Sequence, residues 1–150
     1  MHFELSKKLF NQQLLALEKD DLYSIIKKDS LFALVKVQAG KYLPVLRIVA
    51  DNYDLDPPLI EFANPETGER LDNNKWPRGR GIASGNKLYP GKFICRPGNR
   101  IYHTHPSHID NYFYNYRNTF TIKHFIDIII DKIQNNTWNM NPTGGIYNDK

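Results

Sequence analysis

The chain's single cysteine, Cys95, is the side chain best suited to covalent chemistry. A lone cysteine cannot form an internal disulfide, and its thiolate is a strong nucleophile. The apolar Phe93 and Ile94 before it are typical of a cysteine that only fills a core. The Pro-Gly pair at 97–98, however, favours a turn at the surface. We therefore interpret Cys95 as a functional thiol, with a core-filling cysteine as the alternative.

Polar side chains that could assist a reactive thiol occur on both sides of it. Arg96, Arg100 or a protonated histidine would favour the thiolate. His103 and His105 could take a proton from an incoming amine, because the pKa of histidine is about 6.5. Asn86, or nearby backbone N–H groups, could stabilise a tetrahedral oxyanion.

The same histidines allow a metal site as an alternative. His103, His105 and His108, with Asp110 or Cys95, could supply three or four ligands to zinc. The pattern His-x-His-Pro also resembles part of the JAMM metalloprotease motif, although aromatic residues stand where that motif has its aspartate and serine. We favour hydrogen-bonding and acid/base roles for the histidines, and we expect no cofactor.

The residue patterns predict a sheet that positions these side chains. Three stretches rich in β-branched, aromatic and aliphatic residues, separated by short turn signals, predict a meander of antiparallel strands over 23–29, 31–39 and 43–51. The Pro-Pro pair at 57–58 interrupts the pairing, because neither proline can donate to a ladder. Residues 59–62 then predict a short fourth strand.

Two amphipathic helices flank this sheet in the sequence. Apolar residues at near-helical spacing predict a helix over residues 3–19. Isoleucine and phenylalanine at i, i+3, i+4 and i+7 predict a second helix over 122–133 that packs on the sheet. Thr119 or Thr121 can cap the start of this second helix.

The remaining segments lack periodicity. Residues 63–92, rich in glycine and proline, predict a long irregular connection anchored by Trp76, and such long connections are usually functional. The Asn- and Gly-rich residues 135–150 predict a loosely docked tail with Trp138 as its anchor. We therefore expect one α+β domain over residues 1–134, followed by this tail.

Composition limits the classes of function. The 150 residues favour a single domain, and 20 Lys and Arg against 16 Asp and Glu give a net charge of +4. We expect this excess to be spread along the chain as ordinary solvated surface, so a nucleic-acid partner is not favoured. No apolar run is long enough to cross a bilayer, and no secretory signal is recognisable. The sequence therefore predicts a soluble cytoplasmic protein without a membrane partner.

The order of elements resembles the ubiquitin-conjugating-enzyme (UBC) fold. Residues 53–62 (Tyr-Asp-Leu-Asp-Pro-Pro-Leu-Ile-Glu-Phe) are similar to the family's Tyr-Pro-x-x-Pro-Pro-x-x-x-Phe signature, residues 91–95 to its Gly-x-Ile-Cys, and residues 121–129 to the helix after its active site. The family's His-Pro-Asn is absent, and Asn86 is the nearest candidate for its asparagine. Histidines within 103–108 occur where eukaryotic members have a tryptophan, which looks like the divergent bacterial relatives found in antiphage operons.

This resemblance implies a protein that carries a ubiquitin-like modifier, or another protein C-terminus, as a thioester on Cys95 and transfers it to an amine. His103, His105 and Asn86 would complete the catalytic set. The implied partners are the modifier, an activating-enzyme-like protein and a target such as a signalling nucleotidyltransferase, in bacterial antiviral defence. An inactive UBC-like adaptor is the alternative, and a JAMM-like metallopeptidase that uses His103, His105 and His108 is a third possibility.

Overall fold

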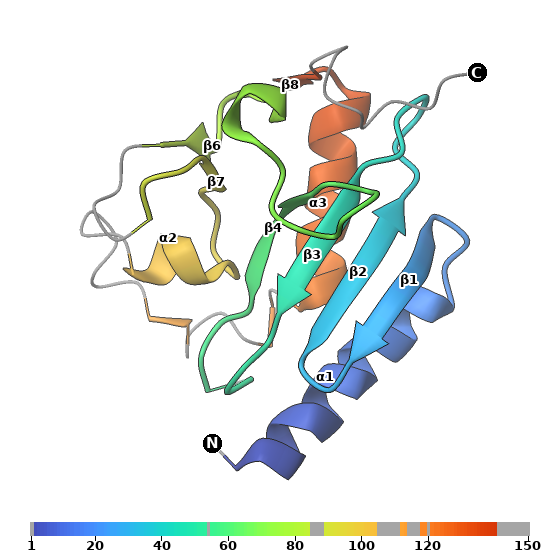
Figure 1. Ribbon diagram of the computed structural model, residues 1–150, viewed down its shortest axis with the longest axis vertical. Coiled ribbons are helices and arrows are strands. Elements are labelled where there is room, and N and C mark those ends of the chain that lie inside the picture. The colour runs from blue at the N-terminus through green and yellow to red at the C-terminus, as the bar shows by residue number, and fades with distance from the viewer. Residues whose placement is uncertain are drawn as a thin grey trace.

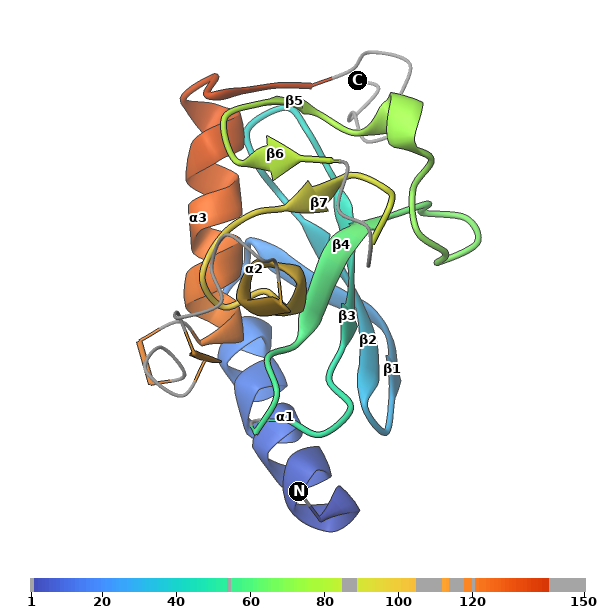
Figure 2. The same cartoon turned by 90° about the vertical axis from the view of Figure 1, so that its left-hand side faces the viewer.

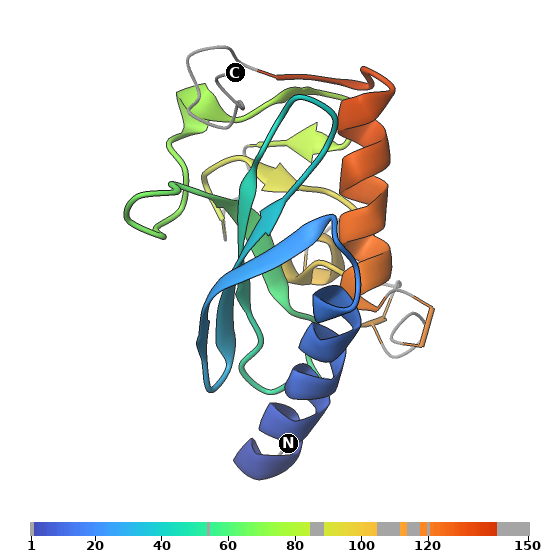
Figure 3. The same ribbon diagram turned by 90° about the vertical axis from the view of Figure 1, so that its right-hand side faces the viewer.

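The computed structural model describes residues 2–53, 55–84, 89–104, 112–113, 118–119 and 121–140. Within these residues the fold is α+β, as predicted: a four-stranded antiparallel sheet carries two long helices on one face (Figures 1 and 3). Short strands and a short helix lie beside the last strand of the sheet, and the segment that contains Cys95 belongs to this group (Figure 2).

The sheet is the predicted meander. Its strands pair in chain order, each antiparallel to its neighbour: β1 (Tyr23–Asp29), β2 (Phe32–Val37), β3 (Val45–Val49) and β4 (Leu59–Ala63). β2 and β3 are shorter than predicted at the turn that joins them. Pro44 has no N–H for the ladder, and its carbonyl accepts the N–H of Val37 at 2.9 Å. The regular pairing therefore begins one residue after the proline.

Both predicted helices are present. α1 (Phe3–Glu18) and α3 (Ile122–Gln134) are amphipathic, and each buries one apolar stripe. The hydroxyl of Thr121 accepts the N–H of His124 at 3.2 Å, so Thr121 is the residue that caps α3. The two helices contact each other and cover the same face of the sheet (Figure 3).

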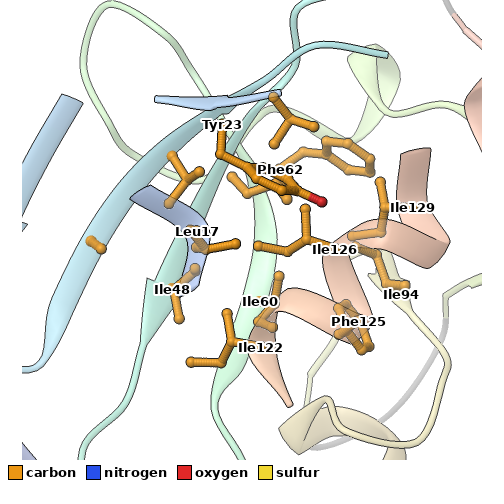
Figure 4. Close-up of a cluster of buried hydrophobic side chains, with 14 of the residues drawn as sticks. Leu17, Tyr23, Ile48, Ile60, Phe62, Ile94, Ile122, Phe125, Ile126 and Ile129 are labelled. Carbon is orange, nitrogen blue, oxygen red and sulfur yellow. The ribbon is translucent and has the colours of Figure 1, made fainter. Parts of the chain in front are cut away.

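The hydrophobic core lies between the helices and the sheet. Six apolar side chains of α3 are buried in it: Ile122, Phe125, Ile126, Ile129, Ile130 and Ile133. Figure 4 shows several of them together with Ile48, Ile60 and Phe62 of the sheet. Phe62 also packs edge-to-face on Trp76 and Trp138, with ring centroids 5.1 and 6.1 Å apart. Because full burial of such side chains stabilises a fold by about 1.5–3 kcal/mol each, this packing holds α3 and both tryptophan segments on the sheet.

The long connection after β4 contains short elements that the sequence did not predict. Three of them lie in the connection: η1 (Asn73–Lys75), β5 (Arg78–Gly79) and β6 (Ile82–Ala83). Two more follow it, β7 (Phe93–Ile94) and α2 (Arg100–Thr104), and β8 (Trp138–Asn139) comes after α3. β6 pairs with β7, whereas β5 pairs with β8 (Figure 2). Elements of two to five residues are too short to show a hydrophobic period, so the residue pattern did not predict them.

Trp76 and Trp138 are both fully buried, as expected of anchors. The indole N–H of Trp138 donates to the carbonyl of Arg80 at 2.8 Å, so the segment after α3 is tied to the turn between β5 and β6. Residues 141–150, the remainder of the predicted tail, lie outside the described residues.

Candidate functional site

Cys95 follows directly on β7. Its N–H donates to the carbonyl of Gly81 at 2.8 Å, which extends the β6–β7 pairing by one residue. Ile94 is fully buried in the core (Figure 4). Cys95 itself is only half-buried. Its backbone is therefore held by pairing, whereas the residue stays partly accessible.

The side chain of Asn99, four residues after the cysteine, fixes the other end of this segment. It is fully buried, its Oδ1 accepts the N–H of Ile60, and its Nδ2 donates to the carbonyls of Ile60 and Ile94, all at 3.0 Å. One amide side chain thus ties β4 to β7. The sequence pointed to Asn86 and overlooked Asn99, whose position directly after a Pro-Gly turn was the only available signal.

His103 is brought to the turn that follows the cysteine. Its Nε2 accepts the N–H of Gly98 at 2.9 Å, and its ring packs edge-to-face against Phe113 with centroids 5.5 Å apart. The lone pair that a general base would use on Nε2 is therefore occupied by a backbone hydrogen bond. In this conformation His103 shapes the turn, and it would have to give up that bond before accepting a proton through Nε2.

The surroundings of the thiol do not favour its ionisation. Burial raises the pKa of Cys95, which is opposite to the activated thiolate that the sequence predicted. Arg100 is directed elsewhere: its guanidinium donates to the carboxylate of Asp51 at 2.6 Å and to the carbonyl of Pro57 at 3.2 Å. The expectation that Arg100 favours the thiolate is therefore wrong, and this arginine instead ties α2 to the Pro-Pro segment before β4.

Three other predicted site residues, Asn86, His105 and His108, lie outside the described residues. Within the described ranges, no group of three or more His, Cys, Asp and Glu side chains is arranged to hold a metal ion. The predicted metal ligands therefore remain a prediction from sequence.

A buried charge network holds the segment before β7. Glu61 on β4 is almost fully buried. Its carboxylate accepts a hydrogen bond from the hydroxyl of Tyr89 and forms a salt bridge with the guanidinium of Arg47 at 2.5 Å. Arg70 donates to the same hydroxyl at 2.9 Å and to the carbonyl of Lys92 at 2.6 Å. The chain is thus tied to β4 before Cys95 as well as after it. A glutamate alternating with apolar residues in a strand was the signal in the sequence for this network.

A cleft of about 280 Å³ shares His103 with the turn that follows Cys95. Its walls combine apolar, aromatic and polar side chains from the loop before β4 and from the region around α2: Leu55, Asp56, Pro57, His103, Thr104, Tyr112 and Phe113. His103 therefore contributes to both the Cys95 turn and this cleft. Together these features describe a half-buried thiol whose pKa is raised, and His103 joins the turn that follows it to this cleft.

Neither a protein-family model nor a curated protein sequence matches this chain. None of the helices within the described residues is long and apolar enough to cross a membrane.

Proposed function

We propose that this protein is a UBC-like carrier that holds a ubiquitin-like modifier, or another protein C-terminus, as a thioester on Cys95 and transfers it to an amine. The observation that carries the proposal is the position of Cys95. The half-buried thiol follows a short strand whose backbone is anchored on one side by Gly81 and on the other, through Ile94, by Asn99. A carrier needs a thiol that stays in one place while two partners approach it in turn.

The order of elements supports a UBC-like fold for this carrier. An N-terminal helix, a four-stranded meander, a proline pair before β4, a long connection with the cysteine and a helix on the sheet follow one another as in that family. By this resemblance the partners would be the modifier, an activating-enzyme-like protein and a target such as a signalling nucleotidyltransferase. The setting would be the cytoplasm of a bacterium that defends itself against viruses.

The chemistry consists of two acyl transfers. The Cys95 sulfur attacks the carbonyl carbon of the donor thioester, a new C–S bond forms, the bond to the donor sulfur breaks, and that sulfur takes the thiol proton. An amine nitrogen then attacks the carbonyl carbon of the Cys95 thioester, a C–N amide bond forms, the C–S bond to Cys95 breaks, and a proton from the amine passes to the released sulfur. Because burial raises the pKa of Cys95, removal of the thiol proton is the demanding part of the first transfer.

A synthetic peptide with a C-terminal glycine thioester can test the proposal without the natural modifier. Mass spectrometry of the intact protein should show a peptide adduct that dithiothreitol removes and that Cys95→Ala abolishes. Added lysine should then release the peptide as an amide. The control is a synthetic peptide of residues 91–98, which has the same thiol without the fold. Discharge to lysine that is no faster from the protein than from this control would rule out a carrier.

The second candidate is a non-catalytic adaptor that uses the same fold to bind a partner. The raised pKa of Cys95 favours it, because a neutral, half-buried thiol is poorly prepared for attack. An adaptor should exchange with the thioester peptide no better than the 91–98 control, and its Cys95→Ser variant should remain folded and should bind the partner unchanged.

A further inference from the structure

Positive charge is concentrated in the segment that contains Cys95. Residues 73–109 contain seven Lys and Arg residues and no Asp or Glu, which leaves 13 Lys and Arg against 16 Asp and Glu in the rest of the chain. The expectation of an even spread is therefore wrong. One continuous segment is strongly cationic, whereas the remainder of the protein is net negative.

Three arginines of this segment lie close to the cysteine. Arg80 directly precedes Gly81, whose carbonyl accepts the N–H of Cys95. Arg96 directly follows Cys95, so Arg80 and Arg96 are the chain neighbours of the two residues that this hydrogen bond joins. Arg78, on β5, is exposed, as is Arg80. β5, β6 and β7 lie near one another in the fold (Figure 2), so the three arginines belong to backbone segments close to that of Cys95.

In the part of the chain that the structure describes, these three arginines differ from the other arginines in their lack of a carboxylate partner. Each remaining arginine of the described chain pairs with Glu61 or Asp51: Arg47, Arg70 and Arg100. Within the described residues, no carboxylate pairs with Arg78, Arg80 or Arg96. The Nε of Arg96 is also buried there without a hydrogen-bond partner. Because no carboxylate offsets these charges within the described residues, an anionic partner would complement them.

We propose that an acidic polypeptide segment, rich in Asp and Glu, docks on Arg78, Arg80 and Arg96 beside Cys95. The guanidinium fork binds a carboxylate through two parallel hydrogen bonds, so arginine suits such a partner better than lysine does. Three exposed or half-exposed arginines can bind several carboxylates along an extended segment.

The same surface is a poor match for nucleic acid. Proteins that bind single strands combine cations with exposed aromatic rings on which bases stack. Among the described residues of this surface, Trp76, Phe93 and Trp138 are buried, and the hydroxyl of Tyr89 is bonded to Glu61. A partner that supplies carboxylates therefore fits the surface better than one that supplies phosphates and bases.

If the partner is the modifier, its C-terminal part would be acidic where it crosses this surface to reach Cys95. That identification rests on the proposed carrier function, whereas the docking of an acidic segment does not. The binding test therefore uses the Cys95→Ser protein, in which no thioester can form. Peptide binding without carrier activity would support the docking surface and refute the carrier function. Carrier activity without peptide binding would support the carrier function and refute the docking surface.

The probe is a fluorescently labelled peptide of about ten glutamates, followed by fluorescence anisotropy. It should bind the Cys95→Ser protein, and the affinity should fall as NaCl rises from about 50 to about 500 mM, because salt screens exposed charges. Reversing two charges with Arg78→Glu and Arg80→Glu together should weaken binding by about tenfold or more. Circular dichroism and thermal unfolding would show that the variant is folded.

The matched control is Lys7→Glu with Lys8→Glu on α1. It changes the net charge by the same amount on a helix that extends away from the β5–β7 end of the molecule (Figure 2). This control should lose less than about twofold in affinity. An equal loss in both variants would show attraction to net charge alone and would overturn the proposal. Tighter binding of a labelled thymidine oligonucleotide of the same length would replace it with a nucleic-acid partner, and no binding at low salt would refute it.

Discussion

The side-chain amide of Asn99 pairs with the backbone of Ile60 much as another strand would, accepting its N–H and donating to its carbonyl at 3.0 Å each. A third bond, to the carbonyl of Ile94, brings β7 into the same arrangement. The edge of β4 is thereby covered at Ile60 by a side chain, and the turn that contains Cys95 is fixed to the main sheet. Backbone groups that are buried at a sheet edge need hydrogen-bond partners, and the side chain of Asn99 is the partner of three such groups.

Asn99→Ala should lower the free energy of unfolding by about 2–3 kcal/mol, because it leaves buried backbone groups of Ile60 and Ile94 without partners. Asn99→Asp should be at least as harmful at neutral pH, since a carboxylate oxygen would face two carbonyls. Urea unfolding followed by circular dichroism measures both. In both variants Cys95 should also react faster with iodoacetamide, because its turn is released. Wild-type stability in Asn99→Ala would show that water replaces the amide.

The sequence predicted the parts of the fold whose pattern repeats. β1 was predicted at its observed bounds from its aromatic and β-branched residues and the turn signal after it, and α1 and α3 were predicted within one residue of theirs because apolar residues repeat over several turns of each helix. The short elements β5 to β8 and α2 were not predicted, since they depend on pairing between distant segments. β5 and β8, for example, are joined through Gly79, where a side chain would collide with the carbonyl of Thr137.

The candidate site was predicted less completely for a different reason. Residue type identified Cys95 and His103 as chemically capable, but only their surroundings determine how they behave. Burial raises the pKa of Cys95, and the Nε2 of His103 is already bonded to Gly98. Asn99 was missed because its role consists entirely of contacts with segments distant in sequence.

Glu61→Gln should lower the free energy of unfolding by about 2–4 kcal/mol, because it leaves Arg47 and Arg70 without their shared carboxylate in a largely buried site. Glu69→Gln, at an exposed position on the neighbouring turn, is the matched control and should change stability by less than about 0.5 kcal/mol. Chemical unfolding at neutral pH compares the two. Equal effects would show that the network does not depend on its buried charge.

Tyr23→Phe should cost about 1 kcal/mol of stability at neutral pH, because the hydroxyl of Tyr23 donates to the carboxylate of Asp127 and so ties β1 to α3. Burial, with a further effect of Asp127, raises the pKa of Tyr23 above its usual value. A raised folded-state pKa means that the contribution is complete below the unfolded pKa of about 10 and is lost as the pH rises beyond it.

The difference in stability between wild type and Tyr23→Phe should therefore be constant from about pH 6 to about pH 9 and should shrink above about pH 10. Tyr112→Phe, at an exposed ring, is the control and should match wild type throughout. A difference that grew with pH would mean that the ionised phenol is the stabilising form.

The pH dependence of Cys95 alkylation distinguishes a poised thiolate from a neutral thiol. Burial raises the pKa of Cys95, so iodoacetamide should modify the folded protein more slowly at neutral pH than it modifies the 91–98 peptide. The rate should still be rising at about pH 9, where the reaction of an ordinary thiol of pKa about 8.5 is levelling off. Cys95→Ser serves as the blank.

A rate that levels off below about pH 8 would contradict the raised pKa and would indicate that nearby cations favour the thiolate.

A raised pKa of Cys95 also affects the proposed thioester transfer. Because burial keeps Cys95 protonated in the free protein, the first transfer requires a base that takes its proton. An acidic segment docked on Arg78, Arg80 and Arg96 would offset the positive charge there and should raise the thiol pKa further. Repeating the alkylation with the glutamate peptide bound should therefore slow it, and acceleration would mean that docking exposes the thiol.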